Sequence, residues 1–108
     1  MSSNYDVLDG KKYTRCYLKH RLYIIVVDTP DGCPHAIQIS ASDFNLNQDR
    51  QLLSVIDWGV RFTTLALRQY SVEKVIRELR NTALGEDTLA AVVASVLIEH
   101  CEGRPNDL

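Results

Sequence analysis

The stretch LYIIVVDTPDGCPHAIQIS at residues 22–40 decides the fold, because it holds two extended segments joined by a tight turn. Residues 22–27 form an unbroken apolar run rich in β-branched side chains, which is typical of a central strand covered on both faces or nearly so. The following TPDG at residues 29–32 favours a turn, since proline presets φ and glycine accepts a positive φ. Residues 35–40 then alternate apolar and polar side chains, which predicts a second strand with its isoleucines facing inward.

A further strand is predicted before the apolar run, because residues 13–19 also alternate. We expect residues 20–21 to form the turn between them, so that the three extended segments make an antiparallel meander. The side of the sheet that faces the helices is expected to carry Cys16, Leu18, Ile37 and Ile39. The opposite side is then open, and it carries Tyr13, Arg15, Tyr17, Gln38 and either Tyr23 or Ile24.

Residues 49–69 have the spacing of one long helix with two apolar stripes, and Asn47 is its expected N-cap. The first stripe is Leu52, Leu53, Ile56, Val60 and Leu67, and the second is Val55, Trp58, Phe62, Leu65 and Ala66. A helix that is apolar on two sides must be buried on two sides. One stripe can cover the sheet, whereas the other needs the remaining helices or a partner chain. Gly59 costs about 1 kcal/mol relative to alanine, and a close helix crossing would justify it.

Two shorter helices complete the fold. Ser71 is the expected N-cap of residues 72–82, and Asp87 or Glu86 opens the last helix. The fold class is therefore α+β, with a three-stranded antiparallel meander followed by three helices, the first long and central. We expect a flexible arm at 1–10, one domain at 11–101 and a flexible tail at 102–108.

Composition limits the function. The 108 residues have a formal charge of −2 and a pI of about 5.8, so the basic field of a general nucleic-acid binder is absent. The three cysteines are an odd number without metal-ligand spacing, which indicates a reduced, cytoplasmic protein with buried or incidental thiols. No apolar run is long enough to span a bilayer, and no signal peptide is visible.

The titratable residues predict no catalysis. His20, His35 and His100 lie in different predicted elements, and none belongs to a recognisable catalytic string. A glycine-rich phosphate loop and a clustered set of metal-ligating side chains are both missing from the sequence. We therefore expect no enzymatic activity, no cofactor and no metal.

Local strings resemble a known family. DGCPHAI at residues 31–37, the long helix of small and aliphatic residues, and YSVEKVIREL at residues 70–79 together resemble the TSCPD domain. That domain lies near the C-terminus of some ribonucleotide reductases, including adenosylcobalamin-dependent ones, and is also a free-standing small protein. The likeness covers residues 22–98. It departs from the family at residues 85–88, where GEDT replaces the Thr-Ser-Cys-Pro-Asp string, so any role of that cysteine does not carry over.

The resemblance implies a loose association with nucleotide metabolism, and two functions follow as hypotheses. The first is a homo-oligomeric module that binds a nucleotide or related phosphorylated molecule, for example a phage-encoded sequestering or sensing protein. Basic side chains and helix N-termini suit phosphate. The alternative is a protein-interaction domain associated with ribonucleotide reductase. The predicted ligand-binding residues are Arg15, Tyr17, Arg21, His35, Gln38, Arg61 and Arg68.

Overall fold

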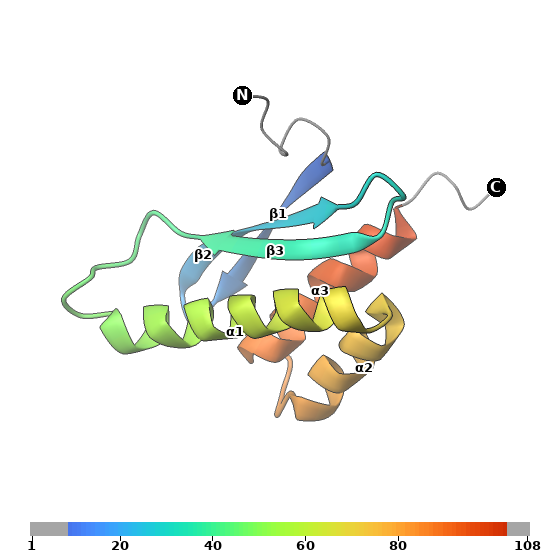
Figure 1. Ribbon diagram of the computed structural model, residues 1–108. Coiled ribbons are helices and arrows are strands. Elements are labelled where there is room, and N and C mark those ends of the chain that lie inside the picture. The colour runs from blue at the N-terminus through green and yellow to red at the C-terminus, as the bar shows by residue number, and fades with distance from the viewer. Residues whose placement is uncertain (1–8, 104–108) are drawn as a thin grey trace, which may run out of the picture.

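The structure is a computed structural model that describes residues 9–103, and it confirms the predicted α+β fold. A sheet of order β1-β2-β3 is followed by three helices, the first of them the longest. Figure 1 shows the three helices on one side of the sheet. The elements are β1 (Asp9–Tyr17), β2 (His20–Asp28), β3 (Pro34–Ser40), α1 (Arg50–Gln69), α2 (Val72–Thr82) and α3 (Leu89–Glu102).

The domain is longer at both ends than expected. Asp9 and Gly10, assigned to the arm from the sequence, begin β1, and Glu102, assigned to the tail, ends α3. The rest of the predicted arm and most of the predicted tail lie outside the described residues.

The turn between β1 and β2 lies at Leu18 and Lys19, so the prediction of a turn at residues 20–21 was wrong. Tyr17 pairs with His20, and both central residues have positive φ, at 47° and 71°. This is the backbone of a primed hairpin turn, which normally selects asparagine and glycine. Because leucine and lysine seldom adopt positive φ, the sequence held no signal for it. The predicted turn at 29–32 is confirmed, since Gly32 has a φ of 86° and donates its N–H to Thr29 O at 2.8 Å.

The predicted orientation is wrong for β1 and right for β3. In β3, Ile37 is buried and Ile39 packs against the core as predicted, and Gln38 is exposed. Tyr13 pairs with Ile24 in the register, and both side chains are buried on the face covered by the helices. Cys16 is exposed, and Leu18 lies in the turn. Tyr13 and Arg15 can face inward because α3 supplies polar partners for both, at His100, Ser95 and Glu99. The alternation in β1 was therefore read correctly, but its orientation was not.

Only one face of β2 is covered by helices, so the prediction of a strand covered on both faces was also wrong. Leu22, Ile24 and Val26 are fully buried beneath the helices. On the other face Tyr23, Ile25 and Val27 are half-buried by neighbouring side chains alone. Lys12, for example, lies with its Nζ 5.1 Å from the centre of the Tyr23 ring. Long cationic side chains of this kind shield apolar surface with their stems while keeping the charge in water.

The observed N-cap residue is the predicted one in one helix of three. Ser71 caps α2 as predicted, since its hydroxyl accepts from the Lys74 N–H at 3.2 Å. The residue before α1 is Asp49 instead of Asn47, and its carboxylate accepts from the Asn45 N–H instead of capping the helix. α3 is capped by Thr88. A hydroxyl that accepts from the N3 N–H satisfies a helix start as well as a carboxylate does.

Candidate functional site

α1 carries an exposed apolar face, which we call the α1 stripe and define as Val55, Trp58, Phe62 and Leu65. Their exposed fractions are 49%, 66%, 54% and 54% respectively. Spacings of three and four residues place them on one side of the helix. Ala66, which the sequence assigned to the same stripe, is half-buried. The predicted second stripe therefore exists, and no element among residues 9–103 covers its large side chains.

The packing of the opposite side of α1 explains why the α1 stripe is exposed to solvent. Ile56 and Leu67 belong to the buried core, and Leu52 and Val60 pack against it. Thr64 fixes the helix to the edge of the sheet, since its hydroxyl accepts from the Ile37 N–H at 3.1 Å. Figure 1 shows α1 lying alongside β3. Because the first stripe packs against the core on that side, the second stripe, on the opposite side of the helix, points away from the sheet.

Aromatic rings dominate the centre of the α1 stripe. The Trp58 and Phe62 rings lie edge to face, with their centres 5.1 Å apart. Trp58 is the only tryptophan of the chain. Scattered apolar side chains are normal on a protein surface, but contiguous ones of this size mark sites of association.

An apolar groove adjoins the stripe where α2 leaves α1. Its volume is about 400 Å³, and Phe62 belongs to both the groove and the α1 stripe. The Lys74 ammonium lies 5.0 Å from the centre of the Tyr70 ring at the same groove. The lining side chains are Phe62, Thr63, Ala66, Tyr70, Lys74, Val75, Glu78, Leu79 and Thr82. Stripe and groove together make one continuous apolar surface.

Charged side chains border this surface along α1. The Arg61 Nε donates to Asp57 Oδ2 at 2.9 Å, and both side chains are exposed. Arg68 is exposed in the last turn of the same helix. An exposed ion pair contributes little to folding stability, so these charges remain available to a partner.

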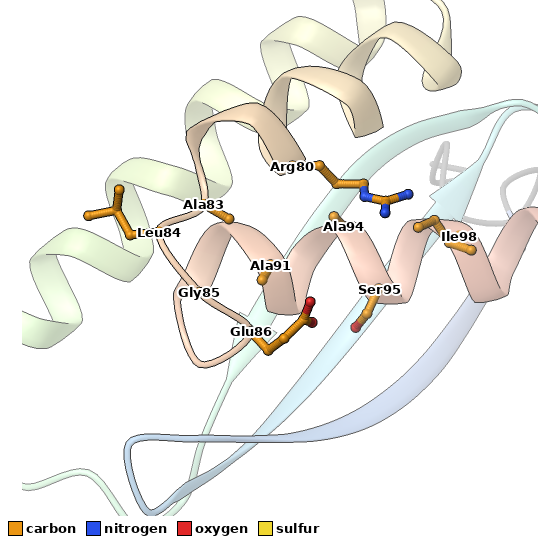
Figure 2. A pocket seen from close by; sticks show the side chains of 9 residues that line it. All are labelled: Arg80, Ala83, Leu84, Gly85, Glu86, Ala91, Ala94, Ser95 and Ile98. Carbon is orange, nitrogen blue, oxygen red and sulfur yellow. The ribbon is translucent and has the colours of Figure 1, made fainter.

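A second hollow lies between the end of α2 and α3 (Figure 2), with a volume of about 400 Å³. Its floor is made of small side chains at Ala91 and Ala94. Figure 2 shows Arg80 and Glu86 projecting from opposite sides, whereas Leu84 points away from the hollow. A cation and an anion at one mouth give no net preference for an anionic ligand, so this hollow carries no functional assignment.

A buried polar network joins β1, β2 and α3, and the sequence analysis did not predict it. The His100 Nδ1 lies 2.8 Å from the Tyr13 hydroxyl, and its Nε2 lies 2.8 Å from Asp28 Oδ1. Burial raises the pKa of the Tyr13 hydroxyl, and the negative charges of Glu99 and Asp28 raise it further. Tyr13 and His100 are each over 90% buried, so no substrate reaches them. The network is structural.

Three of the seven predicted ligand-binding residues are half-buried, and two of these, Arg15 and Tyr17, serve the fold. Arg15 lies against α3, with its Nη2 2.6 Å from Glu99 Oε1 and its Nε donating to Ser95 at 3.1 Å. Tyr17 is half-buried against the core, and His35 is half-buried in β3.

The other four are exposed and are distributed over β2, β3 and α1. Arg21 lies at the start of β2. Gln38 lies in β3, opposite Ile25 of β2. Arg61 and Arg68 are on α1 beside the stripe. Gln38 lines a hollow together with Asp57 of α1, which is also the ion-pair partner of Arg61. The seven residues do not line one pocket.

Comparisons with known proteins assign no family. No family model, curated protein or solved structure matches the chain. The TSCPD resemblance therefore stays a prediction. Within residues 9–103, no group of three or more His, Cys, Asp and Glu side chains is placed to hold a metal. None of the three helices is long and apolar enough to cross a membrane.

Proposed function

We propose that this chain is a non-catalytic protein-binding module that binds a folded partner through the α1 stripe and the adjoining groove. The observation that carries the proposal is the exposure of Trp58, at 66%, on a helix face where Phe62 and Leu65 are also exposed. Tryptophan is strongly over-represented among residues that dominate binding energy at protein interfaces. An exposed tryptophan lowers the solubility of a small domain, and a partner that covers it removes this effect.

The size of the surface suits a protein partner. A large aromatic side chain buries about 150–250 Å² when fully covered, so the exposed parts of the stripe and Tyr70 amount to roughly 500 Å² of apolar area. The largest apolar patch on an ordinary monomer is about 300–600 Å² and is often functional. A standard interface takes about 800 Å² from each partner. The polar rim at Asp57, Arg61 and Arg68 supplies most of the difference.

The surface also has the chemical layout of an interface. Aromatic and aliphatic side chains lie at its centre, and charged side chains lie at its border. Protein interfaces combine an apolar centre depleted in charge with a polar rim in the same way. The hollow of Figure 2 lacks this layout, since its charges flank a floor of alanines.

The nucleotide-binding function, the association with ribonucleotide reductase and the cytoplasmic location stay predictions. Arg61 and Arg68 are the only predicted phosphate-binding residues on the proposed surface. A thermal-shift screen with nucleotides, cyclic ones included, tests the nucleotide function separately, since a bound ligand raises the apparent stability of the fold. An unchanged unfolding temperature across the panel would exclude the nucleotide-binding function.

Position-resolved photo-cross-linking in the native host tests the proposal. The photoreactive residue benzoylphenylalanine replaces Trp58 or Phe62, and, as the control, Arg77 on the exposed side of α2 outside the groove. We expect a discrete polypeptide adduct from positions 58 and 62 and none from position 77. Absence of an adduct at 58 and 62, or equal yields at all three positions, would overturn the proposal.

A further inference from the structure

We infer that the partner on the α1 stripe is a second copy of this chain, with the two α1 helices packed antiparallel about a twofold axis near Phe62. The inference rests on the proposed function, because it names the occupant of the same surface. Closed twofold dimers are the commonest oligomers of soluble proteins, and their interface must be self-complementary. The distribution of side chains along α1 meets that requirement.

The central side chains of the α1 stripe oppose apolar ones when the axis lies at Phe62. In an antiparallel pair centred there, Trp58 lies opposite the second copy's Leu65 and Ala66, whereas Val55, at the end of the stripe, lies opposite its Gln69. Phe62 then meets its own counterpart. These positions share one side of a helix with 3.6 residues per turn. The stripe is therefore covered along its whole length by its own copy.

The charges on the rim select the antiparallel arrangement. Asp57 and Arg68 are eleven residues apart, about three turns, and so lie on the same border of the α1 stripe. An antiparallel pair centred near Phe62 places Asp57 of each copy beside Arg68 of the other, which gives two equivalent contacts of opposite charge. In a parallel pair the twofold axis runs along the helices, so the border that carries Asp57 and Arg68 lies on opposite sides of the interface in the two copies. That arrangement makes no contact between Asp57 of one copy and Arg68 of the other.

The groove gives the second copy a place to anchor. It lies along the C-terminal half of α1, where Phe62, Ala66 and Tyr70 form one wall. An antiparallel second copy presents the N-terminal half of its α1 to this region, including its Val55 and Trp58. Its side chains would fill about 400 Å³ that is lined mainly by apolar atoms. Well-packed aromatic anchors in apolar pockets are the usual centres of binding energy.

Sedimentation equilibrium and the fluorescence of Trp58 test the inference together, since Trp58 is the sole tryptophan. We expect a dimer whose tryptophan emission shifts to the red when dilution dissociates it. Trp58→Ala is expected to raise the dimer dissociation constant by about 30-fold or more, measured by sedimentation. Circular dichroism confirms that the variant is folded. A monomer at all concentrations, or a dimer unaffected by Trp58→Ala, would overturn the inference.

A charge-reversal cycle tests the antiparallel geometry. It uses an Arg61→Gln background, so that the pair between Asp57 and Arg61 within one chain does not contribute. Asp57→Arg and Arg68→Asp are each expected to weaken the dimer by about 5-fold, and the double variant is expected to restore it. Arg77→Asp on α2 is the matched control and should leave the dimer unchanged. Single reversals without effect, or a double variant that fails to recover, would contradict the arrangement.

The two proposals fail in different ways. If the protein is monomeric but positions 58 and 62 cross-link to a different polypeptide, the second copy is excluded and the protein-binding function stands. If positions 58 and 62 give no adduct and the protein is monomeric, both are overturned.

Discussion

The His100 Nδ1 in α3 lies 2.8 Å from the hydroxyl oxygen of Tyr13 in β1, although the two residues are 87 positions apart. The imidazole also reaches the Asp28 carboxylate at the end of β2, with Nε2 2.9 Å from Oδ2. When the imidazole is neutral, it donates from Nε2 to Asp28 and accepts from Tyr13 at Nδ1. One side chain thereby fixes the last helix to two strands.

Replacing His100 should destabilise the fold strongly. His100→Ala leaves the Tyr13 hydroxyl and the Asp28 carboxylate without their partner in a largely buried site. Each unsatisfied buried group costs about 1–3 kcal/mol, so we expect a loss of about 3 kcal/mol in the free energy of unfolding by urea. His35→Ala, outside this network, is the control and should cost less. Equal losses for both variants would show that the network adds no stability.

Tyr13 should make stability fall at alkaline pH. Its pKa is raised above 10.0 in the folded state, chiefly by burial, so the unfolded chain releases this proton first. Its contribution is therefore complete below the unfolded-state pKa and is lost as the pH rises through the folded-state pKa. We expect the difference in unfolding free energy between wild type and Tyr13→Phe to shrink over that interval. A difference that stays constant with pH would contradict this assignment.

Gly59 is expected to be replaceable. A methyl group at this position would lie 3.6 Å from Leu89 Cδ2, which is an ordinary van der Waals distance. The close helix crossing expected from the sequence therefore does not require a glycine at this position. Gly59→Ala should raise the unfolding free energy by up to about 1 kcal/mol through helix propensity. Gly32→Ala is the contrasting case, since its φ of 86° should cost about 1 kcal/mol. A loss from Gly59→Ala would indicate closer packing than this distance implies.

The first hairpin should gain stability from a better turn. Leu18 and Lys19 hold the positive φ angles that Asn-Gly adopts with little strain. The double variant Leu18→Asn with Lys19→Gly should raise the unfolding free energy by about 1 kcal/mol. Lys19→Ala keeps a β-carbon at positive φ and should bring no gain. Chemical denaturation of the three proteins side by side checks the order.

The periodic segments are where sequence reasoning was accurate. The two stripes of α1, the Ser71 cap and the extent of α2 were predicted, because spacing and capping chemistry act within a few residues. The second stripe of α1 was expected to need either the remaining helices or a partner chain. The helices leave its large side chains exposed, and these now make up the candidate site. The seven predicted ligand-binding residues rested on chemical type and on a predicted open sheet face, and neither specifies which side chains meet in the folded chain.

The sequence by itself determined the meander, the three helices and the helix face that is too apolar for water, since each depends on local periodicity and turn chemistry. Only the tertiary structure decided which side of β1 is covered. That choice depends on Tyr13, Arg15 and Asp28 finding His100, Ser95 and Glu99 in α3, at separations of 72–87 residues. The alternation of apolar and polar residues shows that a strand has two different sides. Which side is buried depends on the side chains that α3, distant in the sequence, places against the strand.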